Sequence, residues 1–209
     1  IAILITSCDK SKKNDTCKNK AIIEETEICL PEIKSLNNIF DKKDNNIYIK
    51  YSDIISTFTT VGNGLLAFYV EKSDAGYSCL YYNKKVGNDL SIEEYKIMSE
   101  KMGEYLKKAD YLEKINETVE KEFLKNISLD VPVSIEKYSL NDNVTTYLML
   151  GKKNEQNEDI YTLTSLNLIY LKNKMVIFNY TVKYNDFKTI NKLKQKNDYF
   201  VTRLLNCNE

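Results

Sequence analysis

The amino-acid sequence predicts an α+β fold in which an antiparallel β-sheet carries helices packed on it. Two observations favour this class. Apolar residues recur at helical spacing over residues 91–127 and 187–206, and between these segments they alternate with polar residues, as in strands. The chain has 209 residues, of which 43% are hydrophobic, so one core of ordinary size is expected.

Strands are predicted early in the chain, at residues 46–50, 65–71 and 77–82. The middle strand is the clearest, because its short apolar run is bounded by Gly64 and by the polar turn that ends at Gly76. Residues 21–43 carry many apolar side chains but no regular period. We expect this lead-in to be ordered, with room for one short helix.

Ser91 and Glu94 mark the start of the first long helical segment. The Ser91 oxygen can accept an early backbone N–H while the Glu94 carboxylate reaches back, which is the pattern of a capping box. The apolar stripe that follows is typical of a helix packed on a sheet; it comprises Tyr95, Met98, Met102, Tyr105, Ala109, Leu112, Val119 and Phe123. A single helix of this length is unusual in a small domain. Because Asp110 and Glu113 form a second start signal, we predict two consecutive helices or one helix bent near Asp110.

The period changes to two after Val131, which predicts a first hairpin with its turn at residues 140–143. A second, longer hairpin has strands at 160–171 and 175–184, joined by residues 172–174. One side of its last strand is predicted to carry Val176, Phe178, Tyr180 and Val182. A closing helix, 187–206, completes the chain.

Composition excludes several classes of function. Thirty basic residues balance thirty acidic ones, so the chain lacks the basic surface that nucleic acid requires, and no nucleic-acid partner is expected. Histidine is absent, which excludes Ser-His-Asp and Cys-His catalysis and histidine-ligated zinc. The acidic clusters at 24–27 and 155–159 lack EF-hand spacing and indicate solvated charge. We therefore expect no metal or cofactor site and assign no catalytic residue.

The apolar start of the chain ends in Ile5-Thr6-Ser7-Cys8, which resembles the bacterial lipobox. The resemblance implies that residues 1–7 are the remainder of a signal peptide and that Cys8 carries a diacylglycerol and an N-acyl chain. At ~0.8 kcal/mol per buried methylene, several such chains would anchor the protein stably in a membrane. Polar residues follow Cys8, and their composition is typical of a flexible tether. We therefore expect a tether and lead-in over residues 8–45. The alternative is a buried first strand at residues 2–5 of a cytosolic protein.

With Cys8 acylated, four cysteines remain, and in an oxidising compartment they permit three pairings. We favour Cys17 with Cys29, which would staple the lead-in, and Cys79 with Cys207, which would tie the closing helix to a strand. The alternative is four unpaired thiols that behave as small buried hydrophobic groups.

The order of the predicted elements over residues 46–206 resembles the PsbP-like fold, which envelope lipoproteins of the DcrB type share. The resemblance implies an antiparallel sheet with helices on both faces, and proteins that mostly bind or scaffold partners without performing chemistry. The chain departs from that pattern through its longer middle helical segment and its cysteine-bearing lead-in.

We therefore expect a lipid-anchored protein of the bacterial cell envelope that faces the periplasm, in either the inner or the outer membrane. Its single domain, 46–209, is expected to bind a protein partner without catalysis. An immunity or inhibitor lipoprotein would differ only in its partner. The alternatives of another class are a small-ligand carrier and a hydrolase that uses carboxylates. A deep pocket with two converging carboxylates would favour the hydrolase, whereas an apolar exposed face along residues 95–123 would favour partner binding.

Overall fold

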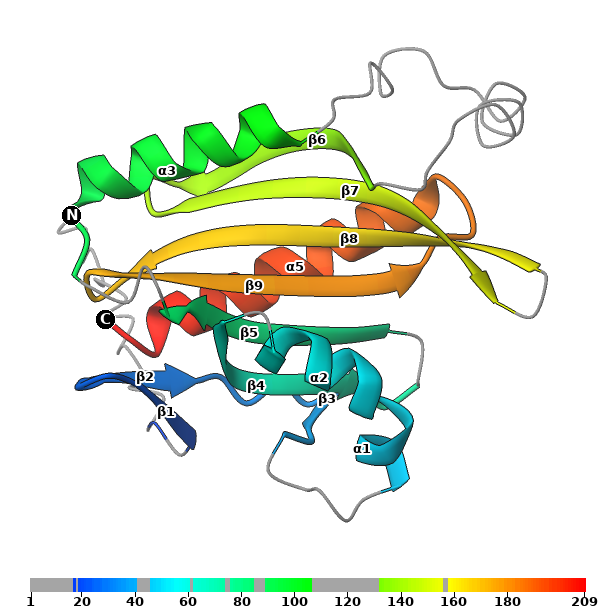
Figure 1. The fold of residues 1–209 in the computed structure, drawn as a ribbon, viewed down its shortest axis with the longest axis horizontal. Helices are drawn as coiled ribbons and strands as arrows, with labels where there is room; N and C mark the ends of the chain where they lie inside the picture. The colour runs from blue at the N-terminus through cyan, green and yellow to red at the C-terminus, as the bar shows by residue number, and fades with distance from the viewer. Residues whose placement is uncertain are drawn as a thin grey trace, which may run out of the picture.

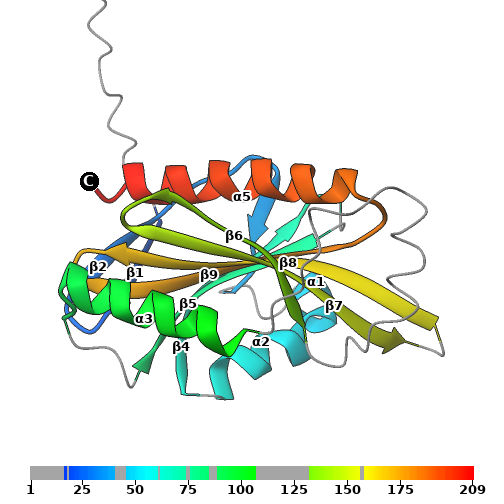
Figure 2. The ribbon, with the colours of Figure 1, turned by 90° about the horizontal axis from the view of Figure 1, so that it is seen from above.

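The computed structural model describes residue 17 and residues 19–40, 46–60, 62–73, 76–84, 89–106, 132–155 and 158–209. Over these residues the chain forms a seven-stranded antiparallel sheet, a separate two-stranded hairpin, and helices on both faces of the large sheet (Figures 1 and 2). The predicted α+β class is confirmed.

The large sheet has the strand order β3-β4-β5-β9-β8-β7-β6. The bounds of its strands, in chain order, are β3 Leu36–Asn38, β4 Asn63–Glu71, β5 Gly76–Asn83, β6 Val133–Asn141, β7 Val144–Glu155, β8 Glu158–Leu171 and β9 Lys174–Lys183. The hairpin of β8 and β9 turns tightly at Lys172 and Asn173, whose φ angles of 49° and 62° suit the right-handed twist of the two strands. Both predicted hairpins are confirmed.

Each face of the large sheet is covered by different helices, as Figure 2 shows. Helix α5 (Lys188–Asn206) lies along one face, where the predicted closing helix is confirmed. Helices α1 (Asn46–Lys50), α2 (Ser52–Thr60) and α3 (Ile92–Tyr105) lie on the other. The predicted capping box of α3 is present: the Glu94 N–H donates to the Ser91 side chain and the Ser91 N–H donates to the Glu94 carboxylate.

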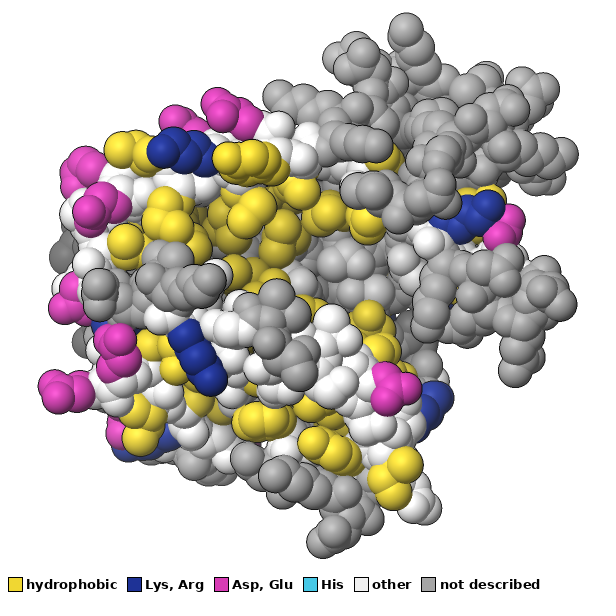
Figure 3. Space-filling model, viewed as in Figure 1, with side chains coloured by type: hydrophobic (Ala, Val, Ile, Leu, Met, Phe, Trp, Pro, Cys, Tyr) yellow, Lys and Arg dark blue, Asp and Glu magenta, His cyan; other side chains and the backbone are white. Residues whose placement is uncertain are grey.

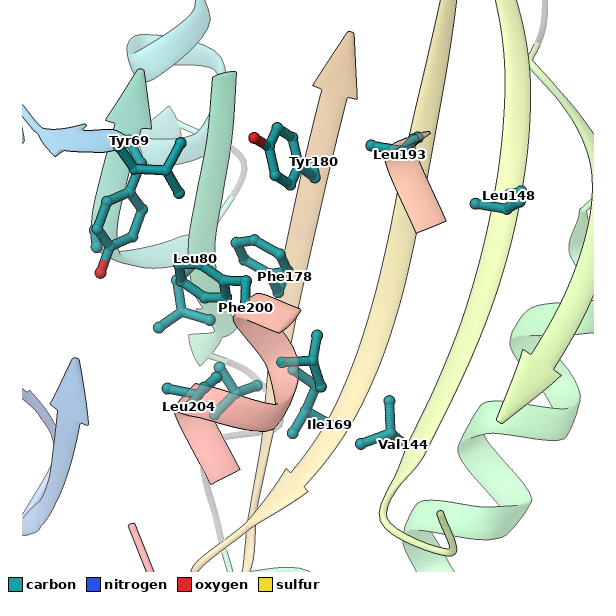
Figure 4. Packing of buried hydrophobic residues seen from close by; sticks show 14 of the residues in the cluster. Tyr69, Leu80, Val144, Leu148, Ile169, Phe178, Tyr180, Leu193, Phe200 and Leu204 are labelled. Carbon is teal, nitrogen blue, oxygen red and sulfur yellow. The ribbon is translucent and has the colours of Figure 1, made fainter. Parts of the chain in front are cut away.

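The core beneath α5 is apolar and closely packed (Figure 4). The Phe200 ring of the helix stacks on the Phe178 ring of β9, with centroids 4.0 Å apart, and meets the edge of Tyr69 at 5.2 Å. As predicted, Val176, Phe178 and Tyr180 share the side of β9 that faces this core. Face-to-edge and stacked aromatic contacts of this kind stabilise a core beyond their buried area.

A buried polar network also joins α5 to the sheet. Asn197 of α5 and Asn167 of β8 are both fully buried. The Asn167 amide donates to Asn197 Oδ1 at 2.7 Å, and the Asn197 amide donates back to Asn167 Oδ1 at 3.0 Å. The Ser165 hydroxyl also donates to Asn197 Oδ1, at 2.7 Å. Each buried donor or acceptor needs a hydrogen-bond partner, and these partners meet in only one position of the helix along the strand. The network therefore fixes that position.

The lead-in forms strands where room for a short helix was expected. Strands β1 (Asn19–Ile23) and β2 (Thr26–Leu30) make the separate hairpin, and β3 joins the edge of the large sheet. The side chains of Ile23 and Ile28 are fully buried in the same core as α5. The lead-in therefore packs on the domain that was predicted to begin at residue 46.

The strand predicted at residues 46–50 is wrong, because these residues form α1. Ile49 is 61% exposed and so does not pack on the sheet. The side chains that pack on the sheet are instead Tyr48, Tyr51, Ile55 and Phe58, at alternating spacings of three and four. That helical stripe continues into α2 and outweighs the short local alternation. The second helix or bend predicted near Asp110 lies outside the described residues.

Candidate functional site

The first predicted disulfide is confirmed. Cys17 and Cys29 are bonded, with their Cα atoms 5.5 Å apart and a separation of 12 residues. The backbone of Cys29 is also clamped by the last turn of the chain, since its N–H donates to Asn208 Oδ1 at 2.7 Å and the Asn208 amide donates to its carbonyl at 2.8 Å. The bond thus holds the start of the lead-in to a strand that is itself anchored on the domain.

The second predicted disulfide is wrong, because Cys79 and Cys207 are not bonded to each other. Successive side chains of β5 point to opposite faces of the sheet. Leu80 faces α5, whereas Cys79 packs in the cluster on the opposite face, beneath α2 and α3. Cys207 follows the end of α5, and its thiol donates to the Cys29 carbonyl at 3.3 Å. The sheet therefore separates the two sulfur atoms. The predicted lipidation site, Cys8, lies outside the described residues.

The described acidic residues of the two clusters, Glu24, Glu25, Glu27, Glu158 and Asp159, are exposed, as expected for solvated charge. In the first, Glu24 accepts a hydrogen bond from Lys174 at 2.6 Å, and Glu27 pairs with Lys20 at 2.7 Å. In the second, Asp159 pairs with Lys152 at 2.8 Å. Within the described parts of the chain, no group of acidic residues and cysteines could hold a metal ion.

Among the described residues, fewer hydrophobic side chains are fully buried on the face of the sheet beneath α2 and α3 than on the face beneath α5. In the cluster under α5, 25 hydrophobic residues are buried and seven are partly buried, whereas 12 are buried and 14 partly buried on the opposite face, counting described residues only. Figure 3 shows hydrophobic side chains gathered on this second face, in the band between α3 and the α1–α2 pair. We call the band the α2–α3 groove; the sheet residues of its hydrophobic cluster include Tyr81, Met149, Leu166, Leu168 and Ile177.

A cavity of about 250 Å³ lies at one end of the α2–α3 groove. Its walls come from β5, β9, β8 and β7, and include Tyr81, Asn179, Thr162, Thr164, Leu166 and Met149. The alternation of strand side chains brings these residues to one face. Gly151 of β7 and Pro132 also line the cavity, and a Cβ at Gly151 would lie 3.4 Å from the Pro132 ring.

Few polar groups reach the cavity. The Asn179 amide donates to the Tyr81 hydroxyl at 3.3 Å, and the hydroxyls of Thr164 and Thr181 share a hydrogen bond of 2.9 Å. The Asn179 Oδ1 atom is buried and has no hydrogen-bond partner among the described residues. Asn179 therefore carries an unsatisfied hydrogen-bond acceptor beside the cavity.

The ionisable groups near the cavity do not suit acid–base chemistry at neutral pH. Burial raises the pKa of the Cys79 thiol well above its ordinary value, although a backbone hydrogen bond with Asn179 opposes the change. Burial likewise raises the pKa of Tyr81, so both groups stay protonated. No carboxylate is among the described residues that line this cavity. The arrangement therefore fits binding, and gives no support to a hydrolase with paired carboxylates.

Sequence reasoning did not single out this cavity. Its residues come from strands that are distant in the sequence, and each looks ordinary within its own strand. One signal was visible in the sequence. Thr162 and Thr164 lie on the same face of β8 as the apolar residues Leu166 and Leu168. Small polar residues on an otherwise buried apolar face mark a place where the covering layer is incomplete.

Comparison of the chain with protein-family models, curated proteins and solved structures gives no match. Among the helices that the structure describes, none is long and apolar enough to cross a membrane.

Proposed function

We propose that this chain is a lipid-anchored protein of the bacterial cell envelope that binds a protein partner through the α2–α3 groove and performs no catalysis. The observation that carries the binding role is the side-chain-sized cavity in the incompletely covered face of the sheet. The antiparallel sheet with helices on both faces supports the resemblance to the PsbP-like fold, which we keep as part of the proposal.

The proposed location in the cell envelope is supported by two cysteine sites. Cys8 ends the lipobox-like sequence, and the Cys17–Cys29 disulfide follows shortly after it. Disulfides persist in oxidising compartments such as the periplasm and are rare in the reducing cytosol. The Cys17–Cys29 disulfide, close in sequence to the lipobox-like Cys8, supports an exported and acylated protein and disfavours the alternative of a first strand in a cytosolic protein.

The size and lining of the cavity favour a protein partner over a small ligand. Small-molecule sites usually enclose roughly 300–1,000 Å³, and this cavity of about 250 Å³ is smaller. It suits one or two apolar side chains, as in the anchor pockets where binding energy concentrates at protein interfaces. The partner's backbone N–H beside such an anchor could donate to Asn179 Oδ1.

Site-specific crosslinking tests the binding role. A photoreactive amino acid at Thr164 should give one discrete adduct in intact cells, and the additional change Leu166→Asp should remove it. The matched control position is Tyr199 on the solvent side of α5, which is 58% exposed and far from the groove. The binding role would be refuted by equal adducts from both positions, or by an adduct that survives Leu166→Asp.

The proposed lipid anchor and membrane location are tested separately in the full-length precursor. Cys8→Ser should abolish acylation, which is measured as a loss of mass at the mature N-terminus, and should move the protein from the membrane fraction to the soluble fraction. A variant that still matures and sediments with membranes would overturn the lipoprotein assignment and leave the groove proposal standing.

A further inference from the structure

A second cavity lies on the other side of the molecule, between the lead-in and the end of α5. It encloses about 540 Å³ and is lined by the loop after β2, the edge strand β3, Tyr69 of β4 and Arg203 of α5. In contrast to the cavity of the α2–α3 groove, its described lining is rich in charged and amide side chains, among them Glu32, Lys34, Asn37, Lys72 and Arg203.

Tyr69 is one of the lining residues and carries a buried hydrogen-bond donor. The residue is only 3% exposed, and its hydroxyl has no hydrogen-bond partner among the described residues. The ring is held by its edge contact with Phe200, and Figure 4 shows the hydroxyl turned away from Phe178 and Tyr180. Burial, with a smaller effect of Cys207, raises the pKa of this phenol well above its ordinary value. The group is therefore a neutral O–H donor that lacks an acceptor.

The charges of the side chains that line the cavity indicate what kind of ligand could accept the Tyr69 hydrogen bond. Three cationic side chains, Lys34, Lys72 and Arg203, line the cavity, and Glu32 is the one carboxylate among the described lining residues. The excess of positive charge among these described lining residues, next to a neutral donor, favours a ligand with negatively charged oxygen atoms. Arginine and lysine with hydroxyl donors are the usual partners of phosphate.

We propose that this cavity binds a phosphate monoester group, with the Tyr69 hydroxyl donating to one oxygen and Lys34, Lys72 and Arg203 balancing the charge. The group could be free in solution or belong to a lipid headgroup, because both present the same dianionic oxygens. The inference does not rest on the partner-binding groove, which lies on the opposite face of the sheet.

Inorganic phosphate is the probe for the first test. A ligand that binds only the folded state raises the midpoint of thermal unfolding by mass action, so the full 209-residue chain is heated with increasing phosphate at constant ionic strength. Tyr69→Phe keeps the ring and removes only the donor. We expect it to weaken phosphate binding about tenfold or more, which corresponds to about 1.4 kcal/mol, and to unfold at a midpoint no lower than the wild type when phosphate is absent.

Two controls separate this site from other tyrosines and lysines. Tyr199→Phe removes an exposed hydroxyl from α5, and Lys192→Gln removes a cation from the start of the same helix, beside a different surface hollow. Both should bind phosphate as the wild type does, whereas Lys34→Gln should bind it more weakly. The proposal is overturned by an absent phosphate effect, by an equal effect in Tyr69→Phe, or by its loss in Lys192→Gln.

Vesicles then identify the source of the phosphate group. Phosphatidylcholine vesicles with and without phosphatidic acid are offered to the same chain. Binding to phosphatidic acid that inorganic phosphate displaces assigns a lipid headgroup, and binding to inorganic phosphate alone assigns a free ligand. Failure of both probes overturns the site without affecting the lipobox or the groove.

Discussion

Asn197→Ala should be among the most destabilising single substitutions in α5. Asn197 is fully buried, and its side chain accepts hydrogen bonds from Ser165 and Asn167 while donating back to Asn167. Alanine is a better helix former than asparagine, so propensity alone would predict a gain. The outcome therefore decides whether the polar network or the helix propensity controls the stability of this helix.

The magnitude follows from the groups that the substitution leaves behind. Asn167 keeps two partners, because its amide still donates to the Phe178 carbonyl at 2.8 Å and its oxygen still accepts from Thr146 at 2.8 Å. The Ser165 hydroxyl keeps only a long contact of 3.5 Å to the Tyr180 carbonyl. A buried polar group without a partner costs about 1–3 kcal/mol. With the lost hydrogen bonds, the free energy of unfolding should fall by about 3 kcal/mol.

Urea unfolding of the oxidised protein, followed by circular dichroism, measures this change. Asn191→Ala is the matched control, since Asn191 lies on the exposed side of the same helix and its loss should change the stability by no more than ~0.5 kcal/mol. The double variant with Asn167→Ala should be less destabilised than the sum of the two single variants, because each removes the same contacts. A loss below about 1 kcal/mol for Asn197→Ala, or strict additivity, would refute the network argument.

Three further predictions concern separate contacts. Burial opposes ionisation of Glu71, but hydrogen bonds from Lys196, Tyr180 and Ser73 outweigh it and lower its pKa below the ordinary 4.5. The stability that this carboxylate contributes should therefore be present above pH 4.5 and be lost as the pH falls through its folded-state pKa. Glu71→Gln should flatten the acid limb of a stability profile, and an unchanged limb would contradict the assignment. Reduction of the Cys17–Cys29 bond, which spans 12 residues, should lower the free energy of unfolding by about 3 kcal/mol in the chain-entropy model. Paired urea curves with and without reductant measure this, and coinciding midpoints would refute it. Gly103→Ala should destabilise α3 although alanine favours helices by ~1 kcal/mol, because its Cβ would lie 2.8 Å from the buried Tyr147 hydroxyl, which donates to the Ser99 carbonyl at 2.6 Å. A higher thermal midpoint in Gly103→Ala would show that Tyr147 moves aside without cost.

The sequence predicted the regular elements best where one period ran long and uninterrupted. The hairpin of β8 and β9 and the helix α5 were found because their patterns extend over many residues and end at clear turns. α1 was missed because five residues are too few to separate a period of two from a period of 3.6. Only the stripe from Tyr48 through Phe58 distinguishes the two, and it crosses the boundary between two short helices.

Sites were harder to predict than elements, because they depend on which face of the sheet a residue occupies. The Cys17–Cys29 bond was accessible to sequence reasoning, since a short hairpin brings near neighbours together. The pairing of Cys79 with Cys207 failed because the sequence does not say which face of the sheet the last helix covers. Leu80, the residue after Cys79 on β5, faces α5, so Cys79 faces the opposite side of the sheet. A face assignment for that strand would have excluded the bond.

The same alternation connects the closed face of the sheet to the α2–α3 groove. Along β8, Ser165 and Asn167 point toward α5 and are held by Asn197, whereas Thr164 and Leu166 lie on the opposite face and line the cavity of the groove. A strand whose every second residue is fixed by buried hydrogen bonds has little freedom to shift, so the residues between them are held in place as well. The lining that β8 contributes to the cavity is therefore held in place by the fold itself. Since a rigid pocket loses little conformational entropy on binding, even a cavity for one or two side chains can serve as an anchor.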